Sequence, residues 1–228
     1  MKKTIIILNL ILAMLVIVGD ICYTMFGGLW LKGLTSLGFV LIGTINLFYA
    51  VKVKSKNIKF CIVMVIGLIL SMLGDIVLNI YFIGGAILFA LGHVAFVIAY
   101  CYLKRFKVKD LIPILVIAIP SSLIITLVPI FDFGGILMQL VCLIYALIIS
   151  CMVGKSVSNY FNDRTFTNLI IMIGSFLFFF SDLMLLFDVF ANVSIVFGLL
   201  CLASYYPAQI LLSYSILHQT LTNKKDLN

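Results

Sequence analysis

The sequence predicts an all-α integral membrane protein, a bundle of eight transmembrane helices that forms one transmembrane domain over residues 1–228. Hydrophobic residues make up 64% of the chain and charged residues only 10%, and the mean hydropathy is +1.31. So few polar side chains are too few to coat a soluble globule. The apolar runs are long enough to cross a bilayer as helices, and they lack the alternation typical of membrane β-strands.

Charged and turn-forming residues separate the apolar runs and place the eight spans. The first run follows two lysines and resembles a signal peptide, but it is long and has no small-x-small cleavage site, so we interpret it as an uncleaved first span. The expected spans lie near residues 4–24, 33–51, 58–81, 84–103, 110–131, 133–153, 165–188 and 192–218.

The basic residues predict the orientation of the bundle, because lysine and arginine beside membrane helices collect on the cytoplasmic side. With eight spans, 14 of the 15 basic residues fall on one face, in the N-terminus, the second, fourth and sixth loops and the C-terminal tail. Only Lys32 falls on the other face. We therefore expect a multi-pass protein of the cell membrane with both termini in the cytoplasm, and the net charge of +7 gives no indication of nucleic-acid binding.

Three carboxylates lie within the expected spans, where an ionisable side chain costs several kcal/mol unless it is paired or neutralised. Asp20, Asp75 and Asp182 each lie about 24–25 Å from the cytoplasmic start of an outward-running helix. Their equal depth predicts one shared site in the outer third of the membrane. If Asp75 and Asp182 share it, their helices must be neighbours.

Other polar groups accompany these carboxylates. Ser71 and Asn79 lie four residues on either side of Asp75 and form a polar stripe with it. His93 lies near mid-membrane in the fourth expected span, where a packing role competes with a catalytic one. The six cysteines show no CxxC spacing, so we expect neither a metal nor a cofactor.

Short motifs occur in a characteristic order along the chain. They are Lys32-Gly33-Leu34-Thr35, Leu73-Gly74-Asp75, Gly92-His93, Phe180-Ser181-Asp182 and Tyr205-Tyr206-Pro207-Ala208-Gln209. In this order, across eight spans, the sequence resembles the lysoplasmalogenase, or YhhN-like, family of membrane hydrolases. Gly33 replaces the usual proline of that family, and Phe96 replaces a common tyrosine three residues after the histidine.

The resemblance implies hydrolysis of the vinyl ether bond of a lysoplasmalogen, a lysophospholipid, to a fatty aldehyde and glycerophosphoethanolamine or glycerophosphocholine. It implies that Asp75 and Asp182 act as acid and base with His93, and that no metal is needed. The expected substrate-binding residues are Lys32 for the phosphate, and Asp20, Asn79, Tyr205, Tyr206 and Gln209. Apart from the substrate, the expected partner is membrane lipid. A small proton- or cation-coupled transporter is the alternative, because paired carboxylates also suit an ion path.

Overall fold

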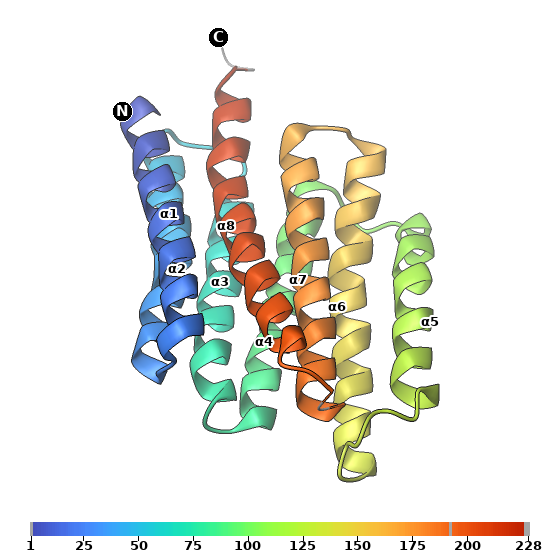
Figure 1. The fold of residues 1–228 in the computed structure, drawn as a ribbon. Coiled ribbons are helices and arrows are strands. Elements are labelled where there is room, and N and C mark those ends of the chain that lie inside the picture. Colours follow the sequence, from blue (N-terminus) through green and yellow to red (C-terminus); the bar gives the residue numbers. More distant parts are fainter. Residues whose placement is uncertain (1, 192, 226–228) are drawn as a thin grey trace.

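The computed structural model describes residues 2–191 and 193–225, with the side chains of 223–225 excepted, and these residues form eight α-helices and one short 3-10 helix (Figure 1). All eight long helices are long and apolar enough to cross a membrane, which confirms the predicted fold class. They are α1 (Lys2–Phe26), α2 (Leu29–Lys52), α3 (Ile58–Leu78), α4 (Phe82–Leu103), α5 (Leu111–Leu127), α6 (Ile136–Asn162), α7 (Phe166–Phe190) and α8 (Val196–Lys225), with η1 (Val108–Asp110) before α5.

Helix α1 begins, and helix α8 ends, at the same end of the bundle (Figure 1). We call this end the terminus face; it also carries the connections 53–57, 104–107 and 163–165. The opposite end, the far face, carries the connections 27–28, 79–81, 128–135 and the turn after α7. The basic residues predict that the terminus face is cytoplasmic, and this orientation stays a prediction.

Two helix ends differ clearly from the sequence-based expectation, because α8 continues to Lys225 instead of ending near residue 218 and α6 is also longer. The sixth helix does not end near residue 153 but continues to Asn162, so that Lys155 lies inside α6 and not in a loop. The Lys155 side chain is 1% exposed and pairs with Asp110, the residue at which the fifth span was expected to begin. The polar end of α6 is therefore buried helix, and hydropathy alone underestimates its length.

Helix α8 lies at the centre of the bundle, against α1, α2, α3 and α7, whereas α5 packs on α6 and η1 at one edge (Figure 1). Helices α3 and α4 pack closely because glycines face each other. A Cβ atom on Gly67 would lie 2.6 Å from the ring of Phe96, and one on Gly92 would lie 3.3 Å from the Gly67 carbonyl oxygen. Small residues at such contacts drive helix association in lipid, where no hydrophobic force acts between helices.

A buried pair of amides adds polar stabilisation. Asn9 Nδ2 donates to Asn46 Oδ1 at 2.9 Å, and Asn46 Nδ2 donates to Asn9 Oδ1 at 2.8 Å and to the Ser213 carbonyl at 3.1 Å. The pair connects α1, α2 and α8, and these bonds orient three of the helices that surround the candidate site.

Candidate functional site

Asp75 is the centre of a buried polar cluster on the far-face half of the bundle, which we call the Asp75 centre. Lys32 Nζ lies 3.7 Å from Asp75 Oδ1, and Ser36 Oγ donates to Asp75 Oδ2 at 2.6 Å. Ser36 and Lys32 lie four residues apart on α2, so one helix face supplies both partners. The hydroxyl groups of Ser36 and Tyr206 are 3.4 Å apart. Lys32 and Asp75 are 8% and 4% exposed, so both charges are almost wholly removed from solvent.

Asp20 of α1 belongs to the same region. It lies close enough to Asp75 for the two carboxylates to repel each other when both are charged. Its Oδ1 atom is buried and has no hydrogen-bond partner among the residues that the structure describes. The Lys32 ammonium, 5.5 Å from the centroid of the Tyr23 ring, is the cation of this region.

The polar stripe on α3 leads from the Asp75 centre to the far face. Asn79 caps the C-terminus of α3, and its Nδ2 donates to the Asp75 carbonyl at 2.6 Å. The Ser71 carbonyl lies 3.5 Å from the Tyr205 hydroxyl, which donates to it from α8. Asn79 and Lys32 both line a groove of about 460 Å³ that includes Cys201 and Asp188 and that we call the far-face groove.

Asp182 lies in a second cluster, the Asp182 centre, whose members come from α4, α6 and α7. Tyr145 Oη donates to Asp182 Oδ2 at 2.6 Å. His93 Nε2 lies 2.8 Å from Tyr145 Oη and 3.2 Å from the same Asp182 oxygen. His93 is fully buried, and its Nδ1 has no hydrogen-bond partner in the described part of the chain. Three groups that can exchange protons therefore touch one another, and no lysine or arginine pairs with this carboxylate among the described residues.

Two small apolar pockets of about 70 and 50 Å³ reach Asp182 and Tyr145. The smaller pocket shares Leu78, Phe82 and Leu185 with the far-face groove. These three side chains therefore lie between the polar residues that line the far-face groove and the Asp182 carboxylate.

The two centres are less directly joined than the sequence led us to expect. No Cα atom of α3 lies within 8 Å of one in α7 in the described chain, because α8 packs between them, so the two helices are not the direct neighbours that we expected. The Phe178 ring lies 4.6 Å from His93 and 5.3 Å from Tyr205 (centroid distances), so aromatic side chains fill the space between the centres. Cys201 lies near both Asp75 and Asp182 and lines the groove, so α8 connects the centres.

The α8 motif supplies aromatic and amide groups to the core. Tyr205 and Tyr206 are 4% and 0% exposed and pack on each other with centroids 5.0 Å apart. Gln209 is 0% exposed, and neither its Nε2 nor its Oε1 has a hydrogen-bond partner among the described side chains and backbone.

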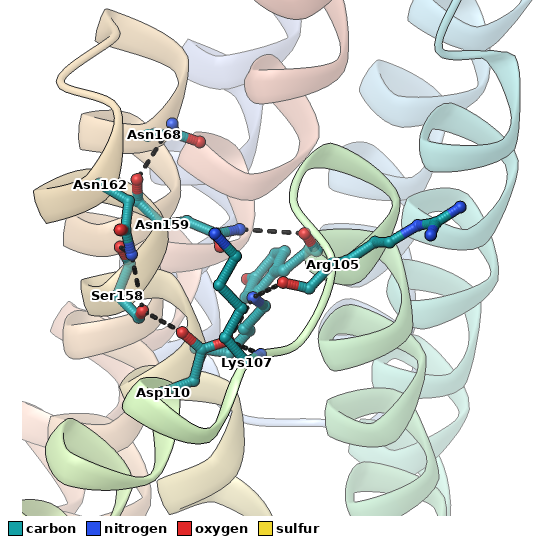
Figure 2. Close-up of polar contacts among 9 residues, drawn as sticks. Arg105, Lys107, Asp110, Ser158, Asn159, Asn162 and Asn168 are labelled. Carbon is teal, nitrogen blue, oxygen red and sulfur yellow. Dashed lines mark hydrogen bonds and ion pairs between the residues drawn. The ribbon is translucent and has the colours of Figure 1, made fainter.

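Sequence reasoning did not identify Tyr145, although the Tyr145 hydroxyl donates the shortest hydrogen bond of the Asp182 centre. Its only signal was a phenol roughly 14 Å along an otherwise apolar helix. The sequence also missed the buried pair of Asp110 and Lys155 near the terminus face (Figure 2). Among residues 2–191 and 193–225, no group of three His, Cys, Asp or Glu side chains is placed to hold a metal ion.

Comparisons with known proteins give one match. The model of the YhhN family matches residues 35–216, most of the chain. No curated protein and no solved structure matches it. The matched range includes Asp75, His93, Asp182 and the α8 motif, whereas Asp20 and Lys32 lie just before it. With so much of its length matched, the chain belongs to the YhhN family of membrane proteins.

Proposed function

We propose that the protein hydrolyses the vinyl ether bond of a lysoplasmalogen in the cell membrane, releasing a fatty aldehyde and a glycerophospho-alcohol. Membership of a family that includes lysoplasmalogenases supports a membrane hydrolase. The main support for lysoplasmalogen as the substrate is that two sites are adjacent. The far-face groove contains the buried Lys32 ammonium, and the smaller apolar pocket beside it ends at the hydrogen-bonded Asp182 carboxyl group. A lysophospholipid has both matching parts, a phosphate and a single chain.

The groove accounts for substrate binding. The phosphate is placed at the Lys32 ammonium, which has three N–H donors and therefore hydrogen bonds to spare beside Asp75. Asn79, on the same groove, offers polar contacts to the glycerol or head group. The alkenyl chain passes between Leu78, Phe82 and Leu185 toward the apolar pockets. This pose brings the vinyl ether to the Asp182 centre.

The chemistry needs one proton delivered to carbon and one water. The protonated Asp182 carboxyl gives its proton to the β-carbon of the vinyl ether, and the oxygen-bearing carbon becomes an oxocarbenium ion. The carboxylate left behind faces this cation, and Tyr145 and His93 hold the carboxylate in place. Water then adds to the cation and returns a proton to Asp182. The resulting hemiacetal collapses to the aldehyde and the glycerol alcohol.

Asp75 has a different role in this scheme from the one expected from sequence. With Lys32 and Ser36 directed at it, Asp75 positions the phosphate-binding lysine. Acid and base steps therefore both belong to Asp182, whereas Asp75 acts through Lys32 on substrate binding. The aromatic side chains between the centres are the reason for separating the two roles.

The test uses purified protein in vesicles and three matched lysolipids. A 1-alkenyl substrate should yield aldehyde, and the 1-alkyl analogue should not react, because it has no double bond to protonate. A 1-acyl analogue that reacts faster than the 1-alkenyl lipid would identify a lysophospholipase and contradict the proposal. Asp182→Asn should lower the rate about 10²- to 10⁴-fold, the usual contribution of an acid–base group. Asp132→Asn, an exposed far-face loop variant, is the control.

One observation favours the alternative, a proton-coupled transporter. Polar groups continue from His93 toward the terminus face, through the Tyr100–Ser175 hydrogen bond to Asn159, whose Nδ2 donates to the Tyr100 carbonyl. However, no hydrogen bond in the described chain joins His93 to Tyr100, and Phe96 and Phe178 lie in that interval, 6.4 Å apart. Proton flux into vesicles that is lost in Asp182→Asn, without aldehyde formation, would favour the transporter.

A further inference from the structure

A groove between α5 and α6 opens on the outside of the bundle near the terminus face, away from both centres. It measures about 490 Å³. Ile112 and Val116 of α5 line one wall, and Val157 and Phe161 of α6 line the other. Ile112, Val116 and Phe161 are each about two-thirds exposed, so they face the surrounding lipid tails. We call this the α5–α6 groove.

The polar end of the groove is basic. Lys109 and Asn162 line it, and Lys104 Nζ donates to the Asn162 carbonyl at 3.1 Å. The connection from α4 to α5 holds four cations in six residues, Lys104, Arg105, Lys107 and Lys109, and none of them forms an ion pair in the described part of the protein. The only nearby carboxylate of this connection, Asp110, pairs with Lys155. The loop therefore keeps its full positive charge.

The buried pair also fixes the shape of this loop (Figure 2). Lys155 Nζ lies 2.7 Å from Asp110 Oδ2 and donates to the Arg105 carbonyl at 3.3 Å. Asp110 also accepts hydrogen bonds from the Lys107 amide, at 3.0 Å, and from the Ser158 hydroxyl. Because these bonds hold the loop against α6 before any ligand arrives, little ordering cost remains for binding. The Arg105 side chain points away from α6 in Figure 2 and is not part of the groove.

We propose that the α5–α6 groove binds an anionic phospholipid of the adjacent leaflet, with its phosphate at Lys109 and Lys104 and an acyl chain between the two helices. A basic pocket between transmembrane helices attracts anionic head groups, at about fivefold in affinity for each lysine near the surface. Zwitterionic lipids fit the apolar walls equally well but lack the net charge. Charge complementarity therefore selects the lipid, and the walls hold its chain. This site is independent of the hydrolase proposal.

Tryptophan quenching by brominated lipid measures this preference. In a Trp30→Phe background, Ile119→Trp places a reporter on the lipid-exposed surface of α5 one turn beyond Val116. Ile66→Trp places a matched reporter at a similar depth on α3, which does not line the groove. The two proteins are reconstituted with brominated phosphatidylglycerol or brominated phosphatidylcholine, and the ratio of the two quenching constants is compared.

We expect the α5 reporter to favour phosphatidylglycerol at least about fivefold and the α3 reporter to show a much smaller preference. Lys109→Gln should reduce the α5 preference about fivefold, and so should high salt, because both remove the charge attraction. Arg105→Gln removes the same charge from the same loop but should change the preference little. Equal quenching by both lipids at the α5 reporter would overturn the proposal. So would equal preferences at both reporters, or equal effects of Lys109→Gln and Arg105→Gln.

Discussion

The phenol of Tyr145 offers a direct test of the Asp182 centre, because one atom separates tyrosine from phenylalanine. Tyr145→Phe removes the donor that lies 2.6 Å from Asp182 Oδ2 and the partner that lies 2.8 Å from His93 Nε2. A hydrogen bond to a charged group contributes about 1.5–3 kcal/mol. If this bond forms fully only when the carboxylate has given up its proton, the loss falls on the transition state. Every 1.36 kcal/mol is tenfold, so the turnover number should drop about ten- to hundredfold with little change in KM.

The assay is aldehyde release from a 1-alkenyl lysophospholipid, measured over a range of substrate concentrations. Tyr100→Phe is the matched control, because Tyr100 is also fully buried and also hydrogen-bonded, to Ser175 at 2.9 Å, but lies away from Asp182. The control should lose about 1 kcal/mol of stability and keep its turnover number. If Tyr145→Phe turns over substrate like the unmodified protein, or if both variants lose activity equally, Tyr145 has no special role in the reaction.

The remaining predictions concern charges. Lys32→Met should raise KM and leave turnover at saturation nearly unchanged, since a phosphate contact stabilises substrate and transition state alike; a lowered turnover with unchanged KM would place Lys32 in the chemistry. Asp75→Asn should act mainly on KM, and its effect should add to that of Asp182→Asn; a double variant no worse than the poorer single one would show that the two carboxylates act as a unit. Lys155→Met should cost about 3–5 kcal/mol in detergent unfolding because it leaves Asp110 buried without its cation, and a second change, Asp110→Asn, should restore most of this; an unchanged unfolding midpoint in Lys155→Met would refute the assignment. A reporter fused to the C-terminus should be cytoplasmic, and an external location would reverse the orientation.

The fold was predictable because the bilayer imposes a strong pattern on the sequence. Eight apolar runs give eight helices, and most boundaries agree within a few residues. The ends of α6 and α8 are the exceptions, and α6 shows the physical reason. Hydropathy scores Lys155 as a loop residue, and only its partner Asp110, 45 positions earlier, makes burial of the ammonium favourable. Sequence spacing does not reveal which distant carboxylate will pair with a buried lysine.

The candidate site was predictable in its members more than in its pairings. Asp75, His93 and Asp182 were identified because ionisable groups in lipid are costly, and all three are hydrogen-bonded or ion-paired in the structure. Equal depth suggested that Asp75 and Asp182 meet, but depth says nothing of the order of helices around the bundle. That order places α8 between α3 and α7 and brings α6, with Tyr145, to Asp182.

The partners of each buried carboxylate distinguish its role. Asp75 has Lys32 and Asp110 has Lys155, so each of these carboxylates faces a lysine ammonium, which favours the charged form. Asp182 has instead a phenol and an imidazole as its hydrogen-bond partners, and no lysine or arginine among the described residues pairs with it. Of these three carboxylates, Asp182 is also the one that lines the two apolar pockets. A group that gives a proton to a lipid and takes one back from water must have no lysine partner and must reach the apolar pockets. We therefore assign proton transfer to Asp182 and charge pairing to Asp75 and Asp110.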